Sequence, residues 1–413
     1  MGNNIENLPE KWKIYSLQEL IDNNIILGHL DGNHGSLYPR KEEFIDKGVP
    51  YISANCIEGD SISFEKAKYL SFERAKQFKK GVAKNRDVLF AHNATVGPVA
   101  LLDIEEDFII LGTSLTYYRC NEEFLKPEYL KHYLNSQIFE NQYLEVMGQA
   151  TRNQVPITKQ RTFFHIVPPL PEQQRIVGKL NGLFENIDQA IGLLKENIAH
   201  TEALMGSVLD EIFSNGNIKL KEVCIIGPKK SEVREMEDDL EVSFLPMKDL
   251  NEHNINFNSM ESKKISEVYK GYTYFADGDI ILAKVTPCFE NGKAGLAKSL
   301  LNGIGFGSSE YHILRPKESV LPEWIYFAVL TEQFRVTGKE NMTGTGGLKR
   351  VPRPFLEEWK IPVPEISIQR KKTKRIVQTQ ERTKQLKSSI EIKLNQLKAL
   401  KSSLLDQAFK GEL

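Results

Sequence analysis

Two polar loop segments carry the side chains with the most distinctive chemistry in this sequence. Arg152, Asn153 and Gln154 follow a short glycine-containing segment, and Lys349 and Arg350 follow another at matching positions in the second half of the chain. Arginine and lysine bind phosphate oxygens, while arginine, asparagine and glutamine can hydrogen-bond to base edges. These residues are therefore candidates for nucleic-acid contacts. The alternative for each is an ordinary solvated loop side chain.

A second pair of segments occupies matching positions but differs in side-chain chemistry. Residues 92–97 read His-Asn-Ala-Thr-Val-Gly, whereas residues 284–293 read Lys-Val-Thr-Pro-Cys-Phe-Glu-Asn-Gly-Lys. Unlike loops on a common scaffold suggest two related sites that bind different targets. The further candidate contact residues are His92, Asn93, Thr95, Lys284, Thr286, Asn291 and Lys293.

Motifs for catalysis and for metal or nucleotide binding are missing from the sequence. None of the eight histidines lies in an HExxH frame, and no GxxxxGK[ST] segment is present. Residues 343–347 could cradle a phosphate, but a flexible turn is the better interpretation. Four cysteines without paired spacing are typical of reduced, buried thiols. We therefore expect no catalytic residues and no metal site in this chain.

The charge of the chain is balanced overall and segregated locally. A net charge of −1 excludes nucleic-acid binding by bulk electrostatics, so basic surface must be gathered in places or supplied by a partner. Residues 64–86 and 370–413 are rich in lysine and arginine, and residues 232–241 are acidic. No apolar run approaches the ~20 residues that span a bilayer, which favours a cytoplasmic protein without membrane contact.

A long helical pattern that occurs twice must position these loops. Apolar residues recur at steps of three and four from Ile176 to Ile212, interrupted at Thr201, and a doubled step of four indicates a stutter. Residues 180–213 align without a gap on residues 376–409. Such a narrow seam favours coiled-coil pairing of the two helices. The predicted pairing residues are Ile176, Leu180, Leu183, Ile187, Ile191, Leu194, Ile198, Ile390, Leu394, Leu397 and Leu404, and the same seam includes Ile376, Leu386, Leu400 and Ala408.

Each helix follows a segment rich in short strand-like runs. In the first half these runs are separated by Gly, Asn and Asp, and residues 49–64 recur as residues 242–257. The fold class is therefore α+β: two mixed, strand-rich globular domains, two long antiparallel coiled-coil-like helices and an internal pseudo-two-fold repeat. The predicted domains are 1–167, a helix in 168–216, 217–360 and a helix in 361–413.

The whole chain resembles the specificity subunit of type I restriction–modification systems. The resemblance rests on the lead PPLPEQQRIV at residues 168–177, the degenerate second lead IPVP with Gln369-Arg370, the strand and loop at residues 279–294, and the ending LLDQAFKGEL at residues 404–413. Ser367-Ile368 departs from the first lead. The resemblance implies that each globular half is a target recognition domain that reads one half of a split double-stranded DNA target.

The same resemblance implies partners that carry the chemistry. Two methyltransferase subunits would dock on the helices and bind S-adenosylmethionine. Translocase–endonuclease subunits would complete the complex, and the ATP and Mg²⁺ of the system would also lie on partner subunits. This chain would itself be non-catalytic. The family places base contacts in recognition-domain loops, here residues 92–97, 152–154, 284–293 and 349–350.

Helix length agrees with such a role. Residues 180–213 would form roughly 50 Å of helix at ~1.5 Å per residue, which is about one to one and a half turns of duplex at ~34 Å per turn. Two rival hypotheses remain at this stage. The chain could be a helical scaffold that assembles proteins without touching nucleic acid, or an enzyme whose site lacks a recognisable motif.

Overall fold

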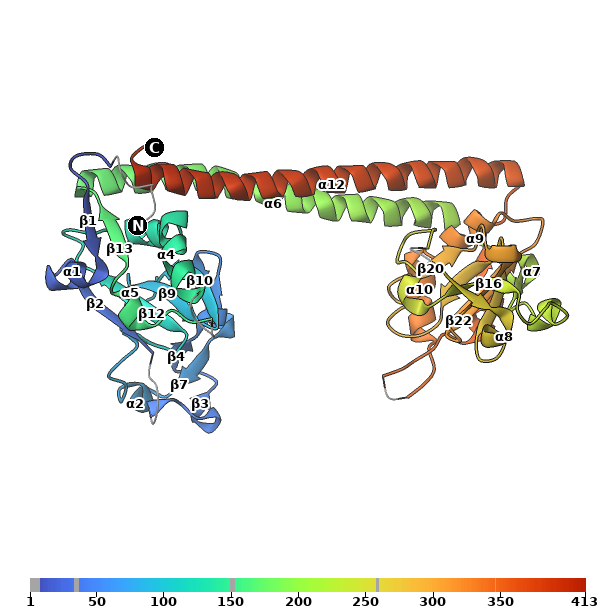
Figure 1. Cartoon of the computed structure of the whole chain (residues 1–413), viewed down its shortest axis with the longest axis horizontal. Coiled ribbons are helices and arrows are strands. Elements are labelled where there is room, and N and C mark those ends of the chain that lie inside the picture. The colour runs from blue at the N-terminus through green and yellow to red at the C-terminus, as the bar shows by residue number, and fades with distance from the viewer. Residues whose placement is uncertain (1–7, 33–36, 149–152, 258–259, 346) are drawn as a thin grey trace. The chain divides into compact units, whose positions relative to one another are not determined.

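The chain folds into two compact α+β units. The computed structural model describes residues 8–32, 37–148, 153–257, 260–345 and 347–413 (Figure 1). Unit 1 comprises Met1–Leu193 with Ile392–Leu413, and unit 2 comprises Leu194–Glu391. Both units contain mixed sheets and segments of the two long helices, so the predicted fold class is confirmed.

The helices differ greatly in length. Two long ones, α6 (Leu170–Phe213) and α12 (Ile366–Lys410), contribute to both units. The short helices of unit 1 are α1 (Leu17–Asp22), α2 (Phe72–Ala75), α3 (Pro127–Leu134), α4 (Gln137–Gly148) and α5 (Ile157–Gln160). Those of unit 2 are α7 (Leu220–Val223), α8 (Ile265–Val268), α9 (Pro322–Ala328), α10 (Glu332–Glu340) and α11 (Arg353–Glu358). Proline starts both α3 and α9, where its missing N–H costs nothing.

The strands are short in both units. Unit 1 contains β1 (Lys13–Ser16), β2 (Ile26–Asp31), β3 (Phe44–Ile45), β4 (Val49–Ile52), β5 (Ile57–Glu58), β6 (Ser61–Ile62), β7 (Lys68–Leu70), β8 (Val82–Ala83), β9 (Val88–Asn93), β10 (Thr95–Leu101), β11 (Ile109–Leu111), β12 (Leu115–Cys120) and β13 (Phe164–Val167). Unit 2 contains β14 (Ile218–Lys219), β15 (Cys224–Ile226), β16 (Glu241–Leu245), β17 (Glu261–Lys264), β18 (Thr273–Ala276), β19 (Ile280–Ala283), β20 (Ala294–Leu296), β21 (Ile304–Gly307), β22 (Tyr311–Pro316) and β23 (Lys360–Ile361).

The sheets repeat the same strand order in each unit. One sheet runs β10-β9-β12-β2 in unit 1 and β20-β19-β22-β15 in unit 2. The other sheet runs β7-β4-β11-β8 in unit 1 and β17-β16-β21-β18 in unit 2. The two central strands of this sheet are parallel in both units. Unit 1 adds β3 at the edge of this second sheet. The sequence repeat is therefore a repeat of topology as well.

A buried ion pair recurs at the start of the equivalent strands β9 and β19. Asp87 is 1% exposed and pairs with Arg119 at 2.7 Å, and Asp279 is fully buried and pairs with Arg315 at 2.7 Å. Each carboxylate also accepts a backbone N–H three residues upstream, from Lys84 or Ala276. Buried charges need such partners. The two units thus fix the entry to this strand in the same way.

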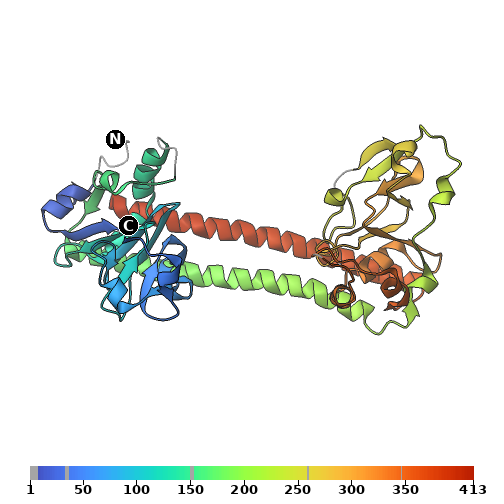
Figure 2. The same cartoon turned by 90° about the horizontal axis from the view of Figure 1, so that it is seen from below.

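The two long helices run antiparallel within each unit. Figure 2 draws α6 in green and α12 in red. In unit 1, Arg175 of α6 donates to the Leu413 carbonyl, and Asp188 pairs with Lys401 of α12. In unit 2, Glu202 pairs with Lys387 and Glu211 with Arg375. The α12 partner number falls as the α6 number rises, which is the register of antiparallel helices. These exposed ion pairs contribute little stability, so apolar packing must hold the helices.

The structure buries only part of the predicted seam between the helices. The buried predicted residues are Ile176, Leu180, Ile187 and Ile390, and those that are partly buried are Leu183, Ile191, Leu194, Ile198, Leu394, Leu397 and Leu404. Leu386 and Leu400 were expected in the same seam but are 50% and 45% exposed, because one partner helix covers only a narrow stripe of each surface.

The end of each helix packs into the core of a globular part. In unit 1, Phe409 near the end of α12 is fully buried against the rings of Tyr129 and Tyr133, at centroid distances of 5.4 and 5.3 Å. In unit 2, Phe213 at the end of α6 lies 4.6 Å from the Trp324 ring. The two phenylalanines are 196 residues apart, as are the repeats. Each globular part is thus attached to the helix that follows it and to the end of the other helix.

We expect Phe409→Ala to destabilise unit 1 by about 3–5 kcal/mol, because it removes a buried aromatic ring and leaves a cavity. Urea unfolding followed by circular dichroism measures the change. Leu400→Ala is the matched control in the same helix, and its 45% exposure predicts a change within ~0.5 kcal/mol. Equal effects of the two substitutions would contradict the attachment of α12 through Phe409.

Unit 1 also buries the histidines His29, His92, His132 and His165. His29, His132 and His165 are 1–3% exposed, and burial lowers their pKa values to about 4, about 4 and about 3 respectively. Their rings are therefore neutral in the folded chain at pH 7. Unfolding returns each ring to a pKa of about 6.5, so the unfolded state binds more protons below that pH.

Stability should consequently fall as the pH drops from about 6.5 toward 4. For one histidine the loss reaches about 3 kcal/mol by pH 4. We expect His132→Gln to reduce this pH dependence, measured by urea unfolding at pH 7.0, 5.5 and 4.5. His200→Gln is the control, because His200 is exposed on α6. A pH dependence that His132→Gln leaves unchanged would refute the assignment.

Candidate nucleic-acid interface

In unit 1 the structure brings four predicted contact residues together at the tip of the β9–β10 hairpin. Ala94 makes the tight turn with a φ of 64°, and Asn93 and Thr95 flank it. Asn93 forms an antiparallel bridge with Gln154, and the Ala94 amide donates to the Asn153 carbonyl at 3.0 Å. Thr95 and Asn153 are exposed, and Asn93 and Gln154 are partly buried. Predicted Arg152 lies outside the described residues.

A buried polar network holds this cluster from behind. The carbonyl of Val155 lies 3.1 Å from Nδ1 of His92 and accepts from Nε2 of Gln160 at 3.0 Å. Oε1 of fully buried Gln160 lies 3.1–3.2 Å from polar atoms of His29, Thr116 and Tyr118. A network of buried, hydrogen-bonded groups is rigid because breaking any bond leaves an unsatisfied group.

His92 is also a predicted contact residue, and the structure places it in the interior of unit 1. Its side chain is 1% exposed, and its ring faces the Val155 carbonyl. Residue 92 is the fifth residue of β9, in a strand whose first five residues are all buried. His92 therefore positions the segment that carries Asn153 and Gln154, and it does not lie on the surface with them.

In unit 2 the equivalent cluster forms where β19 ends. Val285 pairs with Arg350 in an isolated bridge, and the Thr286 amide donates to the Lys349 carbonyl at 3.0 Å. The Thr286 hydroxyl accepts from the Lys349 amide at 3.1 Å. Lys349 is exposed, while Thr286, Arg350 and Lys284 are partly buried. Four predicted contact residues thus share one surface of unit 2.

Two cations of this cluster are engaged within unit 2. Arg350 donates two hydrogen bonds of 2.8 Å to Glu310, which lowers the pKa of the Glu310 carboxyl and raises that of the guanidinium. Lys284 donates to the Ser309 carbonyl at 2.7 Å. These bonds use one of the three N–H donors of Lys284 and two of the five of Arg350, so each cation keeps donors for a phosphate or a base.

The remaining predicted residues of this loop lie elsewhere. Asn291 donates to Glu252 at 3.1 Å, and Lys293 reaches the Met247 carbonyl at 3.4 Å. A bridge between Glu252 and Lys293 ties this part of the loop to the segment after β16. The side chains of Asn291 and Lys293 are therefore bonded to other parts of unit 2, at Glu252 and Met247.

The two clusters share one backbone arrangement. The Val155 amide donates to the His92 carbonyl, and the Val351 amide donates to the Lys284 carbonyl, both at 2.8 Å. A histidine faces the valine carbonyl in each unit, but from different strands: His92 in β9 and His312 in β22, whose Nε2 lies 2.8 Å from Val351. Burial lowers the pKa of His312, so its ring is neutral.

Sequence reasoning missed the supporting residues Gln160, Glu310 and His312. Gln160 falls four residues after Pro156, and the equivalent position in unit 2 is buried Leu356, so the sequence repeat gives no signal for the polar network. Glu310 and His312 could have been found only from strand pairing, which places residue 310 beside Lys284.

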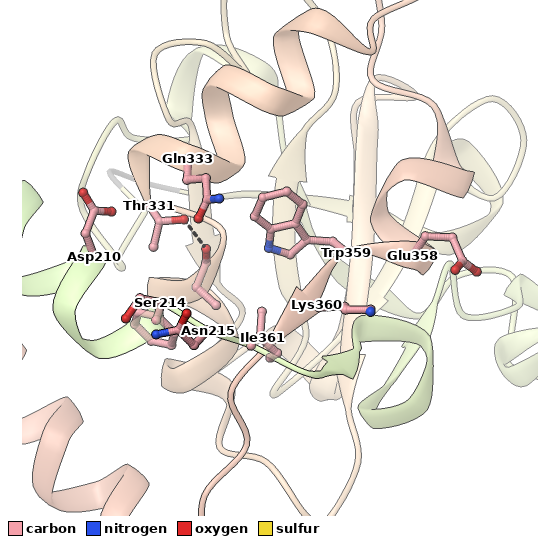
Figure 3. A pocket seen from close by; sticks show the side chains of 12 residues that line it. Asp210, Ser214, Asn215, Thr331, Gln333, Glu358, Trp359, Lys360 and Ile361 are labelled. Carbon is pink, nitrogen blue, oxygen red and sulfur yellow. Dashed lines mark hydrogen bonds between the residues drawn. The ribbon is translucent and has the colours of Figure 1, made fainter.

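Two hollows of unit 2 are separate from the predicted contact residues. The hollow in Figure 3, of about 660 Å³, lies at the end of α6 beside Trp359 and Thr331. The Thr331 hydroxyl donates to the Ala328 carbonyl. The other, of about 1500 Å³, lies between α9, α10 and the helix segments. No predicted contact residue lines either hollow.

Within the described part of the chain, no group of three or more His, Cys, Asp or Glu side chains is arranged to hold a metal ion. Across the same residues, no helix has both the length and the apolar character needed to cross a membrane.

Comparison with known proteins identifies the family. The type I restriction modification DNA specificity domain matches residues 9–197 and again residues 215–396. The specificity subunit of the Escherichia coli type I restriction enzyme EcoEI is 44% identical over 148 residues, 36% of this chain and 24% of that subunit. A putative type I restriction enzyme specificity subunit, MjaX of Methanocaldococcus jannaschii, is 26% identical over 252 residues, 58% of this chain and 52% of that subunit. The chain thus spans about a quarter to a half of the length of these relatives.

Solved structures share the fold. A chain from work on complex assembly and conformational transition of the type I R-M system matches with a TM-score of 0.73 at 23% identity, over 98% of this chain and 100% of that one. The HsdS subunit from Thermoanaerobacter tengcongensis matches with a TM-score of 0.58 at 23% identity, over 98% of both chains. Because the family's domain matches both halves of the sequence, the chain belongs to the type I restriction modification DNA specificity family.

Proposed function

We propose that this chain is the DNA-reading subunit of a type I restriction–modification complex and that each unit reads one half of a bipartite target. The observation that carries the proposal is the pair of surface clusters at β9 and β19. Equivalent backbone bonds present Asn93, Thr95 and Asn153 in unit 1 but Thr286 and Lys349 in unit 2. A common frame with unlike side chains is what two readers of different sequences need.

The helices act as the spacer between the two readers in this proposal. Each globular part is attached to α6 and α12 through buried residues, and helices of 44 and 45 residues resist bending more than a loop does. Roughly 34 paired residues correspond to about one to one and a half turns of duplex. Reading of both half-sites would then require a set number of base pairs between them.

Two methyltransferase subunits are the proposed partners of the helices. Apolar side chains remain exposed on them: Leu193, Ile392 and Leu400 in unit 1, and Leu204 and Leu386 in unit 2. Exposed apolar residues on several helical turns indicate a surface for protein contact. These partners would bind S-adenosylmethionine and transfer the methyl group, and translocase–endonuclease subunits would use ATP and Mg²⁺. This chain then has no catalytic role.

The decisive experiment maps methylated adenines in DNA of cells that express the chain with its methyltransferase partner. A split motif with a fixed gap is expected. A continuous motif, or an absence of methylation together with an absence of binding to any duplex at low salt, would favour a protein scaffold that does not touch DNA.

Variants in the two clusters should then affect separate half-sites. We expect Asn153→Ala to lower base discrimination only in the half-site read by unit 1, by roughly 5–150-fold if it contacts a base edge. Lys349→Ala should weaken binding only through the other half-site. Band-shift titrations of the methyltransferase complex on duplexes with substitutions in one half-site measure both effects.

The control is Lys298→Ala, because Lys298 is an exposed cation of unit 2 that pairs with Glu323, outside both clusters. It should leave binding within about twofold of the unsubstituted complex. Equal losses on both half-sites for Asn153→Ala or Lys349→Ala would contradict the assignment of one half-site to each unit.

A further inference from the structure

The start of each long helix holds a buried glutamine with no exposed surface. Gln173 lies in the first turn of α6, and Gln369 in the first turn of α12, 196 residues later. Both side chains have a relative exposure of 0%. A buried primary amide is costly unless its donors and acceptor are satisfied. The hydrogen bonds of these two residues therefore indicate their structural role.

Gln173 joins three segments of unit 1. Its Nε2 donates to the carbonyls of Phe124 and Pro168, both at 2.9 Å, and its Oε1 accepts from the Lys126 amide at 2.9 Å. Lys126 is the N-cap residue of α3, and its own side chain makes no capping bond. Gln173 thus ties the start of α6 both to Pro168, which precedes the helix, and to the start of α3.

Gln369 makes the same three bonds in unit 2. Its Nε2 donates to the carbonyls of Ser319 at 3.1 Å and Pro364 at 2.7 Å, and its Oε1 accepts from the Leu321 amide at 2.9 Å. Leu321 is the N-cap residue of α9. The arrangement is therefore repeated bond for bond.

A second bond crosses each junction close by. The Tyr129 hydroxyl donates to the Ile166 carbonyl at 3.0 Å, and the Trp324 indole N–H donates to the Pro362 carbonyl at 2.8 Å. Tyr129 belongs to α3 and Trp324 to α9. Two hydrogen bonds at separate points restrain the rotation of α3 or α9 relative to the segment that precedes the long helix far better than one.

These junctions connect directly to the candidate contact clusters. In unit 1, α3 packs on β9 and β10, the hairpin that carries Asn93 and Thr95. In unit 2, α9 packs on β19, β20 and β22, and β19 leads into Lys284 and Thr286. A rotation at the glutamine would therefore be passed through packed elements to the cluster.

We propose that Gln173 and Gln369 are positioning residues. Each fixes the angle between the globular part of its unit and the long helix that follows it, and thereby restricts the gap length between half-sites that the complex tolerates. This inference rests on the proposed function, because gap length has meaning only for a split target. Neither glutamine contacts DNA in this proposal. Each acts through α3 or α9.

Gln173→Met and Gln369→Met test the proposal, because methionine fills a similar volume without the three hydrogen bonds. The methyltransferase complex of each variant is assayed for methylation of duplexes whose gap is correct, one base pair shorter or one base pair longer. We expect the preference for the correct gap to fall about tenfold, as the loss of two or three net hydrogen bonds implies. Discrimination between correct and substituted bases within each half-site should stay within about twofold.

Gln174→Met is the matched control, because Gln174 is the exposed neighbour of Gln173 in the same turn. It should keep the gap preference of the unsubstituted complex. The proposal fails if both glutamine variants keep that preference, or if gap preference and base discrimination fall by the same factor, since that pattern reports general loosening of the unit. An unsubstituted complex that methylates without any gap preference would instead overturn the proposed function.

A milder variant covers the case in which the methionine variants do not fold. Gln173→Asn keeps an uncharged amide but is shorter by one methylene, so it cannot reach the Lys126 amide and the Phe124 and Pro168 carbonyls together. It should relax the gap preference in the same direction. Hydrogen exchange at Lys126 should also accelerate relative to amides within β9 and β12. Unchanged gap preference in this folded variant would refute the proposal.

Discussion

The structure depends on antiparallel pairing of two helices that each end in the other half of the repeat. Because α12 runs back along α6, Phe409 reaches Tyr129 in unit 1, while Phe213 at the end of α6 reaches Trp324 in unit 2. Each globular part is consequently held at the start of its own helix by a buried glutamine and at the end of the other helix by a buried ring. Two attachments restrain a globular part on its helix segments more than one attachment would.

The repeat conserves interactions more strictly than residues. A hydrogen bond from α3 or α9 to the lead comes from a tyrosine hydroxyl in one unit and an indole N–H in the other. The carbonyl of Val155 or Val351 faces a histidine from β9 in one unit and from β22 in the other. Different side chains can supply the same bond wherever geometry allows, so the scaffold is maintained while the surface diverges.

Much of this architecture could be predicted because it depends on local sequence patterns. The helical seam, the proline that starts α3 and the short strand-like runs that become β9 and β12 all depend on neighbours in sequence. The burial of His92, the pairing of Arg350 with Glu310 and the diversion of Asn291 to Glu252 depend on residues 39 to 63 positions away. No local pattern encodes such contacts. The exposure of Leu386 and Leu400 was missed for a related reason, since a periodic stripe does not reveal how wide the covering surface is.

The engagement of Arg350 by Glu310 bears on how, in the proposed function, a chain of net charge −1 would bind DNA. An unpaired arginine would attract any phosphate, and that attraction is independent of sequence. With Glu310 as its partner, the arginine would favour a group that offers a comparable pair of acceptors, such as a guanine edge or a well-placed phosphate. Because the pair lies near the surface, it contributes little stability and is exchanged at little cost. A cation that stays paired until a ligand of matching geometry replaces its partner favours specific binding over non-specific binding. The nearly balanced charge of the whole chain acts in the same direction.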